Sequence, residues 1–534
     1  MAAGGNKSRT RLLAAEKELI PGIRQRNFGA RLQVGLLYPN TYAVGMSSLG
    51  FQLLYRMFSS HLEIQCERFF LPDRWRPGTS GNGLTSLEEG RPLADFDVIA
   101  VCIAYELDLF NLARALTLSG IPPLSRERDE SRPLIICGGP LALMNPEPIG
   151  ALADVVCVSE AEPVLPPFID ELLTSPPQGT WKRHNLLRQL ARLEGWYVPS
   201  LYHPVLDTDG KLIDLAPQDG VPDRIKRVVQ ADLTGLNSAS VLISPGSSFS
   251  DMCLVEAGRG CPHRCAFCFA AAGYHPLRFR RQEDVLEDME NALAATTRIG
   301  LVGISVGDIP WMDELCKTLS GRGIDLSLSS LRPDRITEPL VKLLAEGGCR
   351  SLAVSVDAVS SRLRQAVRKK LSRSEILSGV EQLAPLKLEN LKIYLMVGLP
   401  GETNEDLEEG NELLAEIRQT ARKAAVKRVT VSLNIFIPKP LTSFQREPME
   451  AVPVLKKKVR MLKSNLPKGV SLDFNSGFHD SLIQAAIARG DRRTGEAAGL
   501  AVLSGQGRKG FRELSDCVHT PIEESAFLPW DIVF

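Results

Sequence analysis

Residues 252–256 read Met-Cys-Leu-Val-Glu, and residues 259–268 read Arg-Gly-Cys-Pro-His-Arg-Cys-Ala-Phe-Cys. The first piece is a short apolar run, typical of a buried strand. The second places three cysteines at CxxxCxxC spacing in a stretch rich in loop-forming residues. Thiols this close together can bind one metal centre, because the chain curls around the centre without long-range closure. Buried cysteines that act as small hydrophobes would have apolar neighbours, and these thiols do not.

Two metal centres are compatible with the three thiols. Zinc would require a fourth ligand, for which His263 and His275 are candidates. Structural zinc usually takes paired CxxC knuckles from two places in the chain, and the sequence has no second knuckle. A four-iron cluster held by three thiolates would leave one iron without a protein ligand and open to a small molecule.

Outward from this stretch, strand-like runs alternate with helix-like segments as far as residue 445. This alternation predicts six strand–helix units, or three-quarters of an eight-fold barrel. The strand candidates are Met252–Glu256, Ile299–Val306, Ile324–Ser330, Arg350–Val356, Leu391–Val397 and Arg428–Ile437.

Several of these strands alternate polar and apolar residues, whereas barrel strands are usually apolar on both faces. If the apolar face packs on the outer helices, the polar face points into the barrel lumen. An antiparallel sheet with one wet face would give the same alternation, but it requires hairpin turns where helical sequence stands. We therefore expect a polar lumen lined by Ser327, Ser329, Ser355, Asp357, Ser432 and Asn434.

The first third of the chain predicts a separate doubly wound domain with a parallel sheet. Its strand candidates are Leu32–Tyr38, Asp97–Ala104, Pro133–Cys137 and Asp154–Val158, and helices are expected at Ser47–Ser59 and Asp108–Ser119. The predicted fold class is α/β. The predicted organisation is a leader at 1–29, the doubly wound domain at 30–175, a connector at 176–250 with a hairpin near Asp207–Gly210, the partial barrel at 251–445, and an extension at 446–534 that closes the barrel.

Composition excludes several classes of protein. The 534 residues carry 63 basic and 63 acidic side chains, so the net charge is zero and a globally basic nucleic-acid binder is excluded. Nucleic acid as a partner is neither indicated nor excluded by this balance. No apolar run approaches the roughly 18 residues of a membrane helix, and the N-terminus lacks the apolar core of a signal peptide. Eleven scattered cysteines form no disulfide framework, which favours a reducing cytoplasm.

The cysteine stretch resembles the signature of the radical S-adenosylmethionine (radical SAM) superfamily, CxxxCx-aromatic-C after the first barrel strand. Cys261, Cys265, Phe267 and Cys268 fit this signature. The resemblance implies a four-iron four-sulfur cluster on the three cysteines, whose open iron binds S-adenosylmethionine. It also implies reductive cleavage to methionine and a 5′-deoxyadenosyl radical, with electrons from a reductant such as flavodoxin or ferredoxin. The substrate is not identified by the resemblance.

The same resemblance assigns further cofactor-binding residues. Gly307 and Asp308 occupy the place of the family's Gly-Gly-Glu-like motif for the amino group, although only one glycine and a shorter acid are present. Asp357 falls where relatives carry an acid near the ribose or sulfonium; its alternative role is to cap the following helix. Gly398 and Leu399 resemble the turn that passes near the adenine, and this could equally be a plain strand–helix turn.

Residues 30–175 resemble the cobalamin-binding domain fused to many radical SAM enzymes, with Gly138-Gly139 at the expected distance from the first loop. The loop motif of that domain is DxHxxG, and here Asn40 replaces the Asp and Tyr42 replaces the cobalt-ligating His. Cobalamin would then bind without a lower protein ligand, or the domain has the fold and lacks the cofactor. The competing functions are a cobalamin-dependent radical methyltransferase and a non-catalytic RNA-binding protein stapled by zinc.

The C-terminal segments resemble one branch of the superfamily, many of whose members are uncharacterised. Arg489, Arg492 and Arg493 could meet an anionic substrate, but an ion-pair network with Asp491 explains them equally well. Lys456, Lys457, Lys458, Arg460 and Lys463 are interpreted as one solvated helix face, and His479 as structural. Cysteines 66, 102, 137 and 157 lie in or beside predicted buried strands, so no second cluster is expected.

Overall fold

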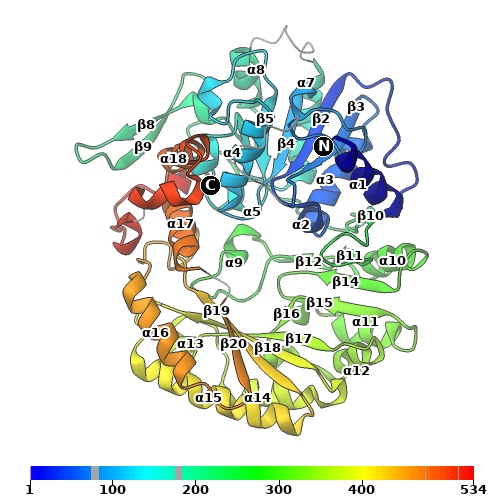
Figure 1. The fold of residues 1–534 in the computed structure, drawn as a ribbon, viewed down its shortest axis with the longest axis vertical. Coiled ribbons are helices and arrows are strands. Elements are labelled where there is room, and N and C mark those ends of the chain that lie inside the picture. The colour runs from blue at the N-terminus through cyan, green and yellow to red at the C-terminus, as the bar shows by residue number, and fades with distance from the viewer. Residues whose placement is uncertain (1, 74–82, 175–182, 475–476, 515) are drawn as a thin grey trace.

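The computed structural model describes residues 2–73, 83–174, 183–474, 477–514 and 516–534. It contains two α/β domains stacked one above the other, each with a central sheet, as Figure 1 shows. The strands of the upper domain end towards the lower domain. The chain therefore belongs to the α/β class, with an N-terminal parallel-sheet domain followed by a barrel-like domain.

The N-terminal sheet has six strands in the order β3-β2-β4-β5-β6-β7, and all neighbours are parallel except β6 and β7. The order of its first five strands is that of doubly wound folds whose ligands bind outside the carboxyl ends of the strands, where the strand order reverses. That point lies between β2 and β4. The strands are β2 (Leu32–Tyr38), β3 (Ile64–Phe70), β4 (Val98–Cys102), β5 (Leu134–Gly138), β6 (Val155–Cys157) and β7 (Trp196–Tyr197).

The predicted strands of this domain are confirmed, but β3 and β7 were not predicted. The hairpin near Asp207–Gly210 is confirmed as β8 (Tyr202–Leu206) and β9 (Leu212–Pro217). The leader pairs with the connector through β1 (Lys17–Glu18) and β10 (Leu242–Ile243).

The second domain is a partial barrel of parallel strands in two sheets. One sheet has the order β11-β14-β15, and the other has the order β16-β17-β18-β19-β20. Their bounds are β11 (Cys253–Glu256), β14 (Arg298–Val302), β15 (Asp325–Leu328), β16 (Ser330–Leu331), β17 (Ser351–Asp357), β18 (Asn390–Val397), β19 (Arg428–Ile435) and β20 (Val470–Phe474). The predicted six strands are all present, with the third split at Ser329 into β15 and β16.

The strand β20 corrects the six-unit prediction, because it adds a parallel partner to β19 from within the segment assigned to the extension. Helix α18 corrects the expectation that the C-terminal extension closes the barrel. Helix α18 packs on α4 and α6 of the N-terminal domain and does not close the barrel. Gly495 and Gly499 make this approach possible, since a Cβ at Gly495 would lie 1.7 Å from the carbonyl oxygen of Pro148.

Helices cover the sheets of both domains. Those of the N-terminal domain and leader are α1 (Ala2–Ala15), α2 (Tyr42–Gly45), α3 (Leu49–Ser59), α4 (Asp108–Leu118), α5 (Pro140–Met144), α6 (Glu147–Gly150), α7 (Ala161–Thr174) and α8 (Arg183–Leu190). Those of the barrel and extension are α9 (Ala270–Gly273), α10 (Gln282–Leu293), α11 (Met312–Leu319), α12 (Glu338–Glu346), α13 (Ser361–Ala366), α14 (Arg373–Gln382), α15 (Asn404–Lys423), α16 (Val452–Ser464), α17 (Phe478–Arg489) and α18 (Arg492–Leu503). Among the described residues, no helix is both long and apolar enough to cross a membrane.

Candidate functional site

Three thiols lie on one loop after the first barrel strand. Two short antiparallel strands, β12 (Gly258–Arg259) and β13 (Arg278–Phe279), join the ends of this loop. Gly260 has φ +88°, and a Cβ there would lie 2.7 Å from the carbonyl oxygen of Tyr274. Only glycine therefore fits directly before the first cysteine.

The thiols of Cys261, Cys265 and Cys268 are free and partly exposed. Burial raises the pKa of Cys265 to about 11; Lys369 lowers it, and the neighbouring Cys268 raises it. Burial also raises the pKa of Cys268, and the charge of Cys261 adds to this rise. The thiols are thus close enough to oppose one another's ionisation, and a cationic metal centre would relieve that repulsion.

Zinc would need a fourth ligand beside the three thiols. Within the ranges that the structure describes, no group of three or more His, Cys, Asp or Glu side chains is arranged to hold one metal ion. His275 is exposed, and the Nε2 atom of His263 lies 2.8 Å from Oδ2 of Asp308. Neither histidine is therefore positioned as a fourth zinc ligand. A four-iron cluster spreads its cysteine sulfurs more widely than a single tetrahedral ion does, so the residues fit the cluster better.

Asp308 lies between β14 and α11, in a short 3₁₀ turn at 306–308. Its carboxylate accepts hydrogen bonds from His263 and Ser305, and its Oδ1 lies 2.8 Å from Nε of Arg335. Burial alone would raise its pKa, but these hydrogen bonds and the Arg335 charge hold the pKa at about 2. Gly307 is required here because a Cβ would lie 2.7 Å from Cβ of Arg335. The expected acid is thus an ionised group that ties down the cysteine loop through His263.

Asp357 ends β17 at a bulge and has φ +67°, which is unfavourable for a residue with a side chain. Its Oδ2 accepts a 2.5 Å hydrogen bond from Nζ of Lys369, which also donates to Oγ of Ser355 at 3.1 Å. The following helix is capped by Ser360, so Asp357 does not serve as its cap. The carboxylate and the ammonium both lie within electrostatic reach of Cys265.

The turn after β18 combines a left-handed glycine with a buried leucine. Gly398 has φ +83°, and a Cβ there would lie 2.5 Å from Leu455 of α16. Its backbone N–H donates to Glu402 at 2.9 Å. The close approach that glycine permits is thus made by Leu455 in this structure. Leu399 is buried, and Phe267 of the cysteine loop is partly buried against the core.

The side chains expected to line the lumen differ in their burial. Burial alternates along β17 and β18, where every second side chain is buried. Ser327 and Ser355 are half-buried and Asn434 is partly exposed, whereas Ser329 lies in the break between β15 and β16 and is exposed. Ser432 of β19 is buried.

Tyr42 belongs to a buried polar network. Its hydroxyl lies 2.7 Å from Oε1 of Glu16 and 2.7 Å from Oγ of Ser244. Glu16 in turn accepts two hydrogen bonds from Arg68, whose side chain is fully buried. Burial raises the pKa of Tyr42 to well above its usual value. The Tyr42 hydroxyl is therefore hydrogen-bonded to the leader and to the connector. It is not positioned to act as an axial ligand of cobalt.

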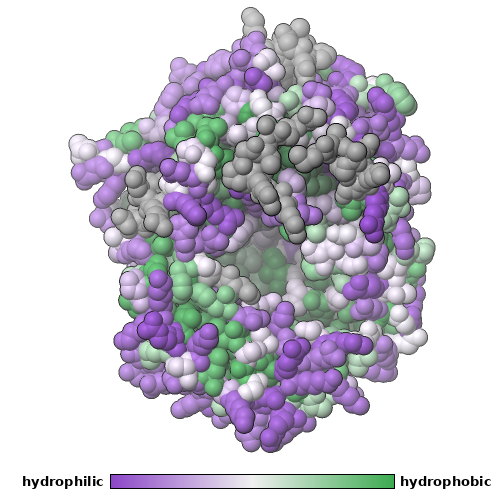
Figure 2. Space-filling model, in the orientation of Figure 1, coloured by the Kyte–Doolittle hydropathy of each residue, from purple (hydrophilic) through white to green (hydrophobic). Residues whose placement is uncertain are grey.

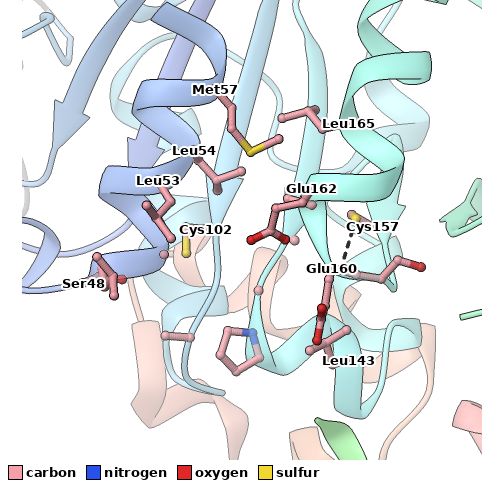
Figure 3. A pocket seen from close by; sticks show the side chains of 18 of the residues that line it. Ser48, Leu53, Leu54, Met57, Cys102, Leu143, Cys157, Glu160, Glu162 and Leu165 are labelled. Carbon is pink, nitrogen blue, oxygen red and sulfur yellow. Dashed lines mark hydrogen bonds between the residues drawn. The ribbon is translucent and has the colours of Figure 1, made fainter. Parts of the chain in front are cut away.

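A cavity lies between the two domains at the carboxyl edge of the N-terminal sheet. Its volume is about 490 Å³. Figure 2 shows the molecule hollowed between its halves, with apolar side chains in the recess. Figure 3 shows apolar side chains of α3 facing α7 across the cavity, with Glu160 and Glu162 nearby. The barrel contributes residues from β12 and from the segment after β14.

The C-terminal arginines have structural partners. Arg492 donates to Glu147 at 2.9 Å and Arg493 to Asp491 at 2.5 Å, which agrees with the ion-pair interpretation. Arg489 donates to backbone carbonyls of the same extension. In α16, Lys458 is buried against Glu402 and Glu450, so the predicted solvated face does not include it. The imidazole of His479 lies 3.1 Å from the carbonyl oxygen of Arg508.

The four N-terminal cysteines are buried. Burial raises the pKa of Cys102 and that of Cys157 to about 12, and it also raises the pKa values of Cys66 and Cys137. Such thiols are poor metal ligands and are chemically inert.

A partial parallel barrel that presents three thiols on the loop after its first strand defines the class of protein: an α/β iron–sulfur enzyme. Residues 50–199 match the family described as radical SAM proteins, N-terminal, and residues 255–414 match the radical SAM superfamily. The chain belongs to the radical SAM superfamily and is a radical SAM enzyme.

Relatives of this chain differ in how much of it they share. It is 27% identical over 463 residues to the uncharacterized protein MJ0966 of Methanocaldococcus jannaschii, which covers 86% of this chain and 88% of the relative. It is 31% identical over 180 residues to the ribosomal protein uS12 methylthiotransferase RimO of Pelotomaculum thermopropionicum, covering 31% of this chain and 40% of that protein. The latter match shows nothing about the remaining parts of either protein.

One solved structure is similar over nearly the whole chain. It is the radical S-adenosylmethionine methyltransferase TsrM from Kitasatospora setae, with cobalamin and a [4Fe–4S] cluster bound. The TM-score is 0.51 at 13% identity, over 92% of this chain and 99% of that chain. This similarity concerns the fold alone.

Lys369, Arg332 and Arg335 are the residues of the site that sequence reasoning missed. Arg332 precedes and Arg335 ends a short 3₁₀ helix at 333–335, Lys369 follows helix α13, and none of these segments has a recognisable sequence pattern. The only local signal is the pair Lys369-Lys370, which looks like an ordinary charged turn.

Proposed function

We propose that this enzyme reductively cleaves S-adenosylmethionine to methionine and a 5′-deoxyadenosyl radical, which then takes a hydrogen atom from a substrate carbon. The observation that carries the proposal is the set of three partly exposed thiols on the loop after the first barrel strand, beside the buried Lys369–Asp357 pair. Such a loop fits a four-iron cluster with one open iron.

Cys261, Cys265 and Cys268 would hold the cluster, and the cluster would deliver one electron to the carbon–sulfur bond of S-adenosylmethionine. An external reductant such as flavodoxin or ferredoxin supplies that electron. Asp357 and Ser355 lie where they can accept hydrogen bonds from ribose hydroxyls, and Lys369 orients both. Asp308 holds His263, and with it the cysteine loop, in place. Gly398 and Leu399 are proposed only to form part of the wall of this site.

Production of 5′-deoxyadenosine tests the proposal. The full chain is reconstituted with iron and sulfide without oxygen, reduced with dithionite, and assayed for 5′-deoxyadenosine from S-adenosylmethionine. Cys265→Ala should lose both the brown colour and the product. Cys349→Ala removes a half-buried thiol elsewhere and should retain both. Absence of product from a fully loaded wild-type protein, with or without cell-extracted small molecules, would contradict the proposal.

A cobalamin-dependent methyl transfer is the second candidate, favoured by the fold similarity to TsrM. Cobalamin would bind here without an axial ligand from Tyr42, whose hydroxyl is held by Glu16 and Ser244. We expect hydroxocobalamin not to be retained after incubation and gel filtration. Retention of one equivalent, measured by its visible absorbance, would favour the methyltransferase.

A further inference from the structure

We propose that the cavity between the two domains binds an uncharged, largely apolar small molecule, which is the substrate or its apolar portion. The identification of this molecule as the substrate rests on the proposed function; the binding itself does not. The cavity lies apart from the three cysteines of the loop, Asp308 and Asp357, none of which lines it.

The walls of the cavity are apolar on three sides. Helix α3 contributes Leu49, Leu53, Leu54 and Met57, and Leu165 of α7 faces them across the sheet (Figure 3). The floor is formed by β4, β5 and β6, including Gly138. A volume of about 490 Å³ lies within the range of small-molecule sites, which are mostly apolar with a few polar groups.

The charges at one end of the cavity select against anions. Among the described residues that line the cavity, Arg259 is the single cation. Its guanidinium lies 2.9 Å from Glu160, 2.5 Å from Glu162 and 2.8 Å from Glu256. Glu160 also pairs with Arg278 at 2.8 Å, so three carboxylates and two guanidinium groups leave one net negative charge at this end. A phosphate or carboxylate would meet repulsion there and no available cation, so nucleotides and phosphorylated lipids are poor ligands.

The barrel wall of the cavity lies at the carboxyl ends of the first two barrel strands. Gly258 and Arg259 immediately precede the cysteine loop, Val302 ends β14, and Gly303 and Ile304 follow that strand. An apolar molecule held against this wall would extend from the N-terminal sheet to the edge where the cofactor residues lie. Hydrogen abstraction from an unactivated carbon requires such a water-poor environment.

A neutral fluorescent probe tests binding without cluster or cofactor. N-phenyl-1-naphthylamine should bind the full-length protein saturably, with one site per chain, and at least tenfold more tightly than the anionic 8-anilinonaphthalene-1-sulfonate. Leu53→Gln and Met57→Gln should each weaken the binding of the neutral probe at least tenfold. Leu500→Gln is the matched control, because Leu500 is an exposed leucine on α18, and it should bind as the wild type does.

Three outcomes would overturn the proposal: no saturable binding, equal binding by the Leu53→Gln and Met57→Gln proteins when their circular dichroism is native, or preference for the anionic probe. Displacement of the probe by one equivalent of retained hydroxocobalamin would assign the cavity to a cobalamin nucleotide and would also overturn it. Because the binding assay uses protein without a cluster, its result is independent of whether 5′-deoxyadenosine is formed.

Discussion

Lys369 and Asp357 show how single residues set the electrostatics of the candidate site. Both side chains are largely buried, and the pair lies beside Cys265. A buried carboxylate next to three thiolates would be unfavourable alone, because like charges raise one another's free energy in a poorly solvated site. The ammonium of Lys369 offsets that repulsion, and its hydrogen bond holds Asp357 in a backbone conformation that side chains rarely adopt.

Replacement of Lys369 by methionine should therefore make the cluster harder to reduce. The reduced cluster carries one more negative charge and would lose a nearby cation, so its midpoint potential should fall and 5′-deoxyadenosine formation should drop about tenfold, the effect of roughly 1.4 kcal/mol. An EPR-monitored redox titration measures the potential at equal iron content. Lys369→Arg should restore it, and Lys370→Met, at an exposed neighbour, should leave it unchanged. Equal potentials in the Lys369→Met and wild-type proteins would contradict this role.

At the scale of elements, the sequence predicts those strands whose burial follows a simple rule. Strands β4 and β5 are continuous apolar runs, β2 is apolar except for Gln33, and β17 alternates buried and half-buried residues as its sequence does. Strand β3 was missed because Gln65, Glu67 and Arg68 interrupt its apolar run, although all three are buried. Arg68 is compensated by Glu16 and Glu88, and no local pattern reveals partners so far along the chain.

The candidate site also has a part that the sequence predicts and a part that it does not. The three cysteines are predicted from their spacing alone, because their ligand function needs only one loop. The residues that surround the cysteines are not predicted from the sequence, since Arg335 and Lys369 reach the cysteine loop from other barrel units. Strand β20 was missed for a third reason: it is a short edge strand with no fully buried side chain, so its pattern is weak. The extension was misplaced because Gly495 and Gly499 mark a close helix contact without identifying the partner.

At the scale of the whole molecule, charged residues join the two domains beside the site. Arg259 connects the start of the cysteine loop to Glu160 and Glu162 of the N-terminal domain. Lys439, in the segment after β19, pairs with Glu106, which is almost completely buried. The same segment supports the cysteine loop, because the N–H of Phe444 donates to the carbonyl of Ala266 at 3.1 Å. Cluster binding and domain contact should therefore depend on each other.

Lys439→Met should weaken both the domain contact and cluster retention. It leaves the Glu106 carboxylate buried without its partner, which costs up to about 3–5 kcal/mol for a fully buried pair and less here because Lys439 is partly exposed. We expect the melting temperature of the reconstituted protein to fall by several degrees, and the iron bound after gel filtration to fall with it. Differential scanning calorimetry and iron analysis measure the two effects, with Lys463→Met, at an exposed position of α16, as the control. The double variant Lys439→Met/Glu106→Gln should recover part of the lost stability, because it removes the unpaired charge. If the single variant keeps the stability and iron content of the wild type, the Lys439–Glu106 contact does not couple the cluster loop to the N-terminal domain.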